Sequence, residues 1–179
     1  MTQPDMRHAD KTGAAIQRTI KAFTRRPGCA RNTYKVTAQL GDGLRATTRE
    51  HDWKIDFDMP VALGGDGTWP TPGVYGRAAL VGCIAIGIRM EAVQGKLPLT
   101  ALSVSMEVDC DDRGLFGLAD VPPGYGGFRI GIMVESPAPD AEVRAVIDRA
   151  LARSPWYDVF ARAQNIRADV TVAAPEMAG

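Results

Sequence analysis

The side chain with the strongest potential for chemistry is Cys83, which lies in the apolar run 78–88 beside Gly82. A cysteine reacts as its thiolate, and a thiolate needs a nearby cation or hydrogen-bond donor. Most cysteines in apolar helices are inert packing residues. Two interpretations of Cys83 therefore stay open. It is either a buried structural side chain or a reactive thiol placed where close contacts require small neighbours.

Two further cysteines, Cys29 and Cys110, lie far from Cys83 in the sequence. Cys110 continues an alternating apolar pattern and is predicted to face inward as a structural residue. Cys29, in a Pro-Gly-Cys-Ala segment, is predicted to lie exposed in a linker. An odd number of widely spaced cysteines does not make a disulfide framework. We therefore expect a reducing compartment, the cytoplasm.

Several classes of site are disfavoured by what the sequence lacks. It has only two histidines, His8 and His51, and no CxxC or HExxH motif, so we expect no metal and no cofactor. A Ser-His-Asp triad would depend on His51 alone, without a GxSxG motif. The loop 64–67 lacks the Lys-Ser/Thr of a phosphate-binding loop, and the acidic residues of 109–112 lack calcium-loop spacing.

The bulk composition describes one globular domain. The chain has 179 residues, 45% of them hydrophobic, and its 21 basic residues balance 21 acidic ones. A neutral total gives no reason to expect nucleic acid or a membrane as partner. The apolar run 78–88 is too short to span a bilayer. We expect a flexible N-terminal tail at 1–9, a single domain at 10–173 and a loose C-terminal tail at 174–179.

Periodicity divides the domain into alternating elements. Helices are predicted at 10–25, 74–95, 140–151 and 156–163. Strands are predicted at 34–40, 102–110, 128–134 and 166–172. A return strand after the turn 41–43, which alternates most clearly over 52–58, forms one long hairpin with the strand 34–40. Asp10 or Thr12, Asp140 and Ser154 are the expected N-caps.

This order predicts an α+β domain with antiparallel strands. The helix at 74–95 is apolar on all sides and so needs cover on every side. It also contains Gly76, Gly82 and Gly87, each of which lowers helix propensity by about 1 kcal/mol relative to alanine. We expect close packing at these glycines, and a second copy of the chain covering the face that the sheet leaves open. The sequence thus predicts a homodimer.

Several motifs, taken in order, resemble the OsmC/Ohr superfamily of osmotically inducible and organic hydroperoxide resistance proteins. They are Gly64-Gly65, Pro70-x-Pro72, Ala78-Ala79-Leu80-Val81-Gly82-Cys83, Leu97-Pro98-Leu99, Asp112-Arg113-Gly114 and Ser154-Pro155. The N-terminal helix resembles the OsmC-like branch that carries such an extension. The resemblance implies the OsmC-like fold, with antiparallel sheets around a central apolar helix in an intertwined homodimer.

The resemblance also implies a site. Peroxidases of this family attack the peroxide O–O bond with a thiolate, which becomes a sulfenic acid, and Cys83 matches this residue. The second, resolving cysteine falls at Ser154, and the family's glutamate falls at Gly73. The family's arginine belongs to the first hairpin, where Arg45 and Arg49 are the nearest candidates. Further partners for the thiol could come from Arg77 or Glu50.

Two functions follow as hypotheses. The first is a one-cysteine, thiol-dependent reductase of organic hydroperoxides, which uses Cys83 and is regenerated by an external thiol because Ser154 cannot form a disulfide. The second is a non-catalytic protein of the same fold that binds an apolar small molecule at its dimer interface.

Overall fold

The computed structural model describes residues 6–173 and contains four α-helices and five strands in these residues. The helices are α1 (Met6–Arg25), α2 (Pro72–Gln94), α3 (Asp140–Ala152) and α4 (Pro155–Ala161). The strands are β1 (Thr37–Leu40), β2 (Ala46–Glu50), β3 (Trp53–Phe57), β4 (Ala101–Cys110) and β5 (Tyr125–Glu135). The fold is α+β, as predicted.

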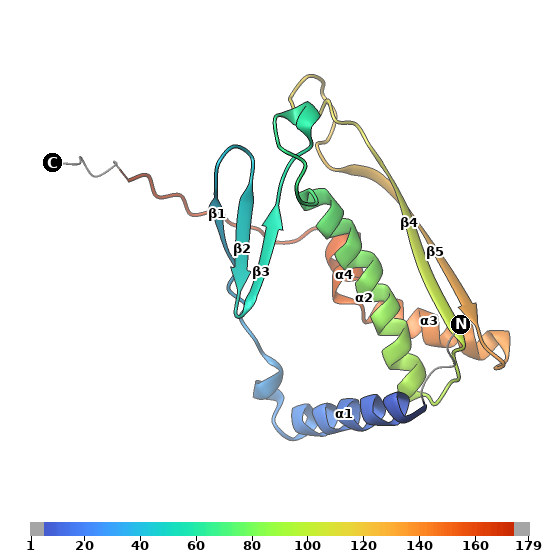
Figure 1. The fold of residues 1–179 in the computed structure, drawn as a ribbon. Helices are drawn as coiled ribbons and strands as arrows, with labels where there is room; N and C mark the ends of the chain where they lie inside the picture. The colour runs from blue at the N-terminus through green and yellow to red at the C-terminus, as the bar shows by residue number, and fades with distance from the viewer. Residues whose placement is uncertain (1–5, 174–179) are drawn as a thin grey trace.

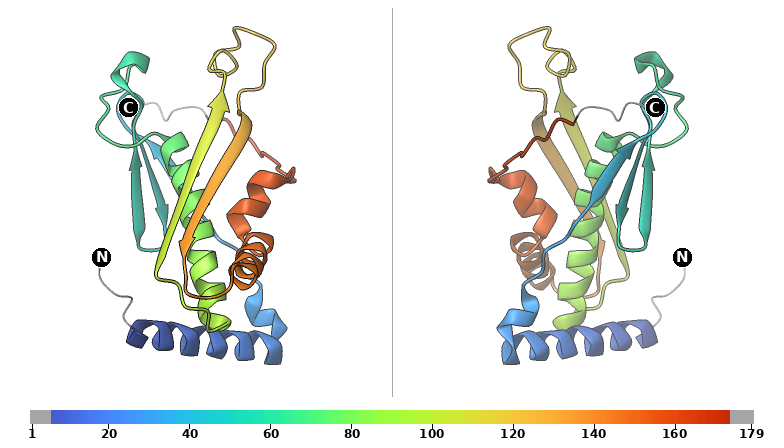
Figure 2. Two further views of the ribbon diagram at one scale, coloured as in Figure 1. Left: turned by 90° about the vertical axis from the view of Figure 1, so that its right-hand side faces the viewer. Right: turned by 90° about the vertical axis from the view of Figure 1, so that its left-hand side faces the viewer.

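Helix α2 forms the axis of the molecule. The β4–β5 hairpin runs along one side of it and the sheet β1–β2–β3 along another, while α3 and α4 lie beside its middle (Figures 1 and 2). Helix α1 lies across the C-terminal end of α2 (Figure 1). The small sheet is attached to α2 through Tyr75, whose ring packs 4.9 Å from that of Phe57 and whose hydroxyl donates to the Asp56 carbonyl at 3.1 Å.

The core is one stripe of α2 covered by α3 and by the inner face of the β4–β5 hairpin. Leu80, Ile84, Ile88 and Ala92 recur at helical spacing and are almost fully buried. Val146 and Ala150 of α3 pack against them. The other faces of α2 stay open in the single chain, where Ile86 is 64% exposed.

By length and composition alone, α2 could cross a membrane, with a mean hydropathy of 1.3 over its most apolar window. Helix α2 has 23 residues and extends well beyond the apolar run 78–88. A helix in the core of a globular protein can be equally long and equally apolar. The buried stripe of α2 packs against α3 and the β4–β5 hairpin, as expected of such a core helix.

The hairpin β4–β5 alternates as expected, with Leu102, Val104 and Met106 turned toward the core. The prediction for Cys110 is wrong, because its side chain is exposed. A register shift between Asp109 and Cys110 interrupts the ladder and ends the alternation at this point.

The prediction of one long hairpin at 34–58 is also wrong. The segment forms a three-stranded antiparallel sheet in the order β1–β2–β3. Glu50 pairs with Trp53, so His51 and Asp52 alone make the second turn, and His51 adopts a positive φ of 49°. A single non-glycine residue in this region is tolerated in a tight turn, which is why the turn has no glycine signature.

The predicted last strand, 166–172, does not form in the single chain. Residues 162–173 have no regular structure and extend past the small sheet (Figure 1). Ile166, Val170 and Val172 are 84–91% exposed. The alternating pattern is real, but a strand needs a neighbour, and no described segment of the chain pairs with this one.

The starts of α1 and α3 differ from the predicted caps. Helix α1 begins at Met6, so neither Asp10 nor Thr12 caps it, and 6–9 are helical rather than a flexible tail. The rest of that predicted tail, 1–5, and the predicted tail 174–179 lie outside the described residues. Asp140 is the first helical residue of α3 rather than its cap, and its carboxylate accepts a hydrogen bond from Arg144 at 2.7 Å.

The loop before α2 is organised by one buried carboxylate, Asp58. Its oxygens accept hydrogen bonds from the backbone N–H of Met59 at 2.7 Å and of Thr68 at 2.9 Å, and from the Thr68 hydroxyl at 2.8 Å. These bonds, with the Thr68 backbone contributing most, lower the pKa of Asp58 to about 2. At Gly65 the loop leaves no room for a side chain, since a Cβ would lie 2.0 Å from the Met59 carbonyl oxygen.

We predict that Asp58→Asn destabilises the fold in a pH-dependent way. The folded-state pKa lies below the ordinary value, so the carboxylate stabilises the fold fully above about pH 4 and loses this effect as the pH falls toward about 2. The difference in urea midpoint between wild type and Asp58→Asn should shrink over this range. Asp148→Asn, at an exposed position, is the control. A difference in urea midpoint between wild type and Asp58→Asn that does not change with pH would contradict this role of Asp58.

Candidate functional site

The N-terminus of α2 is fixed by its sequence. The Thr71 hydroxyl accepts a hydrogen bond from the Val74 N–H at 3.4 Å, and Pro72 occupies the first helical position, where its missing N–H has no consequence. This start sets the rotation of the helix. It turns Leu80 and Ile84 into the core and Cys83 toward the junction of α3 and α4.

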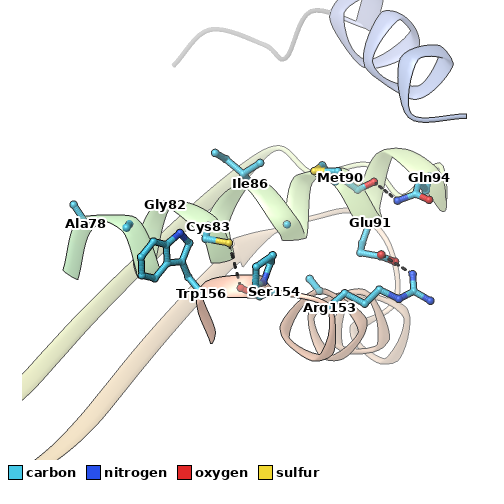
Figure 3. Close-up of a pocket in the computed structure, with 14 residues that line it drawn as sticks. Ala78, Gly82, Cys83, Ile86, Met90, Glu91, Gln94, Arg153, Ser154 and Trp156 are labelled. Atoms are coloured by element: carbon cyan, nitrogen blue, oxygen red, sulfur yellow. Dashed lines mark hydrogen bonds and ion pairs between the residues drawn. The ribbon is translucent and has the colours of Figure 1, made fainter. Parts of the chain in front are cut away.

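Ser154 lies at that junction and faces Cys83 (Figure 3). Its Oγ is 3.4 Å from the Cys83 Sγ, and either atom could be the donor. The same oxygen caps α4 by accepting from the Tyr157 N–H at 3.3 Å, and the residue is only 3% exposed. The predicted cap is therefore confirmed, and the position implied for the second cysteine lies beside Cys83.

Cys83 and Ser154 line a cavity of about 640 Å³ between α2 and the α3–α4 junction. Most of its wall is apolar or small. These lining residues are Ala78, Ala79, Gly82, Ile86, Gly87, Met90, Ala150, Pro155 and Trp156. The Cys83 side chain is half-buried, so a ligand in the cavity can reach the sulfur. Trp156 lies at the Cys83 end of the cavity (Figure 3).

The other end of the cavity holds an ion cluster. The Glu91 carboxylate, on α2 and 8% exposed, accepts from Arg153 at 2.7 Å (Figure 3). It also accepts from Arg149 at 3.3 Å. Glu91, Arg153 and Trp156 are lining residues that the sequence analysis missed. A single carboxylate eight residues after Cys83 in an otherwise apolar helix face is the signal that could have pointed to Glu91.

The two candidate arginines lie elsewhere. Arg45 binds the Asp66 carboxylate, to which its Nε donates at 2.9 Å, and this bond raises its pKa. Arg49 lies in β2 opposite Lys54. Neither residue lines the cavity that contains Cys83 in the single chain.

Gly73, the position implied for the glutamate, lies in the first turn of α2. A Cβ there would be 3.0 Å from the Arg77 Nη1 and 3.5 Å from the Tyr125 hydroxyl. Arg77 donates to that hydroxyl at 2.8 Å and lies over the Tyr125 ring. Arg77 is therefore engaged with β5, and a carboxylate at 73 would have met it directly.

The remaining thiols are poor candidates. Cys29 is exposed in the short 3₁₀ helix Pro27–Ala30. The pKa of the exposed Cys110 is raised, above all by the negative charge of Asp112. In the part of the chain that the structure describes, no three His, Cys, Asp or Glu side chains come together in a way that could hold a metal ion.

The arrangement thus combines one accessible thiol, one hydroxyl in contact with it and an apolar cavity with a charged far end. A hydroxyl can donate to a thiolate or to an oxygen bound to the sulfur. The arrangement places an apolar cavity directly beside the Cys83 sulfur.

The family is now clear. Residues 65–169 match the family model described as OsmC-like protein, and the chain belongs to this family. The predicted superfamily and fold are confirmed. No curated protein sequence matches the chain.

Solved structures agree with this fold. The chain is similar to an OsmC-like protein from Mycoplasma pneumoniae, with a TM-score of 0.59 and 16% identity over 73% of this chain and 88% of the other. It is also similar to a putative osmotic stress induced and detoxification response protein from Psychrobacter arcticus, with a TM-score of 0.53 and 19% identity over 72% and 87% of the two chains. A weaker similarity, with a TM-score of 0.49 and 23% identity over 72% and 89%, is to an organic hydroperoxide resistance protein OsmC from Legionella pneumophila.

The contact between Cys83 and Ser154 leads to a direct test. In Ser154→Cys the introduced sulfur takes the place of an oxygen that lies 3.4 Å from the Cys83 Sγ, so mild oxidation should join the two sulfurs. Intact mass should fall by about two daltons, and peptide mapping should link 83 to 154. Ser136→Cys, near Pro98, is the control. A Ser154→Cys variant that keeps both thiols free would contradict the geometry.

Proposed function

We propose that the protein is a one-cysteine, thiol-dependent reductase of organic hydroperoxides. The observation that carries this proposal is the half-buried Cys83 thiol in an apolar cavity, with the Ser154 hydroxyl 3.4 Å from its sulfur. Membership of the OsmC-like family supports it.

The proposed cycle has three steps. The Cys83 thiolate attacks the peroxide oxygen distal to the carbon chain, the O–O bond breaks, and the alcohol leaves with a proton, which gives a sulfenic acid. An external thiol then displaces water from the sulfenic acid and forms a mixed disulfide. A second thiol attacks that disulfide and releases Cys83 and the oxidised reductant. Ser154 donates to the thiolate and then to the sulfenate oxygen.

A specific observation favours the second candidate, binding of an apolar molecule without chemistry. The charged groups that line the cavity, Glu91 and Arg153, are paired with each other and lie at its far end. Arg45 is bound to Asp66, and position 73 carries no carboxylate. Among the residues that line the cavity, no cationic side chain lies at the Cys83 end.

We also propose that the working unit is a homodimer in which a second copy covers the open face of α2. Gly76 and Gly82 have no neighbouring atom within 4 Å of a Cβ built on them, although Gly87 packs on Ala150 of α3. Ile86, on the same helix, is 64% exposed. The expected close packing thus exists at Gly87 within the chain, and a partner is the natural cover for the other two glycines.

The C-terminal segment supports the same assembly. Ile166, Val170 and Val172 alternate as in a strand and are 84–91% exposed. Strands β1 and β3 are the edges of the small sheet and have unpaired backbone groups. We propose that the segment 166–172 adds to such an edge in the second copy.

A cytoplasmic location, with small or protein thiols as reductant, agrees with the three free cysteines.

The chemistry is tested by brief exposure to cumene hydroperoxide with a dimedone-type sulfenic acid trap. Mass spectrometry should find the adduct on Cys83 and not on Cys29 or Cys110. Cys83→Ser should abolish peroxide consumption, a loss of at least about 100-fold, because the nucleophile is gone.

Cys110→Ser is the matched control and should keep full activity, since the raised pKa of Cys110 leaves little thiolate. Equal activity in the two serine variants would overturn the proposal. An unmodified Cys83 would also overturn it and would leave apolar ligand binding as the function.

The homodimer is tested at Gly82. In an isolated chain Gly82→Ala should stabilise the fold by about 1 kcal/mol, since the methyl group meets nothing and helix propensity rises. Against a second copy packed at this point, the methyl group should weaken the dimer instead. Light scattering should show a dimer for wild type at micromolar concentration and partial dissociation for the variant.

Gly87→Ala is the control, because its Cβ would make ordinary contacts of 3.9–4.0 Å with Ala150 inside the chain. A monomeric wild-type mass, with Gly82→Ala more stable than wild type, would rule out the homodimer.

A further inference from the structure

The neutral total charge conceals a strong separation of charge along the chain. Residues 10–35 contain seven Lys or Arg and one acidic residue, Asp10, whereas residues 36–179 contain thirteen basic and nineteen acidic residues. The seven cations are Lys11, Arg18, Lys21, Arg25, Arg26, Arg31 and Lys35. Every one of them is exposed. The expectation that nucleic acid is not a partner rested on the total alone.

The cations of α1 gather on one face. At 3.6 residues per turn, Lys11, Arg18 and Arg25 recur every seven residues and so lie in one row, with Lys21 next to it. The apolar side chains Ile16, Ile20 and Phe23 fall on roughly the opposite side. The helix therefore separates a basic face from an apolar stripe.

The packing of α1 decides which face is presented outward. A Cβ on Gly13 would be 3.2 Å from the Val93 side chain of α2, and Gly13 and Ile16 are half-buried. Both belong to the N-terminal half of the apolar stripe, which therefore faces the C-terminal end of α2, while Ile20 and Phe23 further along the stripe are 42% and 41% exposed. The basic row is on the far side of α1, which lies at the margin of the molecule (Figures 1 and 2).

We propose that this basic row binds the phosphate backbone of double-stranded nucleic acid. The row from Lys11 to Arg25 is about 21 Å long, with cations about 10.5 Å apart, and Arg26 and Arg31 follow it in the chain. A straight row of this length can follow one strand of a duplex, whose phosphates are contacted by Lys and Arg without regard to sequence. The rest of the chain carries an excess of negative charge, so the contact is confined to α1 and the segment after it.

A membrane surface fits this geometry less well. An interfacial helix inserts its apolar stripe among the lipids while its basic side chains reach the headgroups, so both faces take part. Here Gly13 and Ile16 hold the N-terminal half of the stripe against α2, on the side away from the basic row, so only Ile20 and Phe23 would be left to insert among lipids.

The test is fluorescence anisotropy of the full-length protein with a labelled mixed-sequence DNA duplex of about 20 base pairs, in salt from about 50 to 200 mM. Wild type should bind with an affinity that falls steeply with salt. Neutralising Arg18→Gln, Lys21→Gln and Arg25→Gln together should weaken binding at least about tenfold at low salt and reduce the salt slope by about 3. These side chains are exposed, so the fold should be unaffected, which thermal unfolding checks.

The matched control removes three cations from the body with the same change of net charge: Arg113→Gln, Arg144→Gln and Arg162→Gln. It should bind as wild type does. Absence of duplex binding by wild type at low salt would overturn the proposal, as would an equal loss in the two triple variants. Binding to vesicles of equal phosphatidylglycerol and phosphatidylcholine, without duplex binding, would overturn it in favour of a membrane.

Discussion

Helix α2 has apolar side chains on all of its faces, and the positions of α3, α4 and the β4–β5 hairpin follow from the need to cover them. The β4–β5 hairpin and α3 cover the stripe of Leu80, Ile84 and Ile88. Burying each such side chain contributes about 1.5–3 kcal/mol, which makes this stripe the main source of stability. The small sheet is attached only near the start of the helix, through Tyr75 and Phe57. The faces that remain, with Ile86 and Gly82, are left open in the described chain.

The same constraint creates the site. Because α2 must turn its largest side chains into the core, Cys83 falls on the neighbouring face, where the α3–α4 junction approaches. A helix that starts at Pro155 needs a cap, and Ser154 is among the residues best suited to cap it. The Ser154 hydroxyl therefore lies beside the Cys83 thiol whether or not it takes part in a reaction. A cysteine at 154 would be placed equally well by the backbone, so replacing it by serine changes the redox chemistry and improves the cap without moving the chain.

The sequence predicted the central helix, the β4–β5 hairpin, α3 and the Ser154 cap, because each has a strong period or a Ser-Pro signature. The prediction from sequence failed where a turn has no sequence signature and where the structure depends on residues far apart in the chain. The turn at His51 has no glycine, so two strands were taken for one. The segment 166–172 alternates but pairs with nothing in the chain. Residue type and setting point to Cys83, the resemblance pairs it with Ser154, and the structure places the two atoms 3.4 Å apart. Glu91 and Arg153 were missed because an ion pair between two helices depends on how the helices pack, which periodicity does not encode.

The proposed reaction at Cys83 and the proposed covering of the open face of α2 constrain each other. A one-cysteine cycle requires an external thiol to reach the sulfur, so at least one side of Cys83 must stay open in the assembled protein. A second copy against Gly82 and Ile86 would close the cavity from the α2 side, since both residues line it. The reductant must then approach past Trp156, at the α4 side of Cys83 (Figure 3). Trp156 is 43% exposed, and first a ligand and then a reductant would pass it on the way to the Cys83 sulfur. In the homodimer this side chain, rather than the apolar wall of α2, would control access to the thiol.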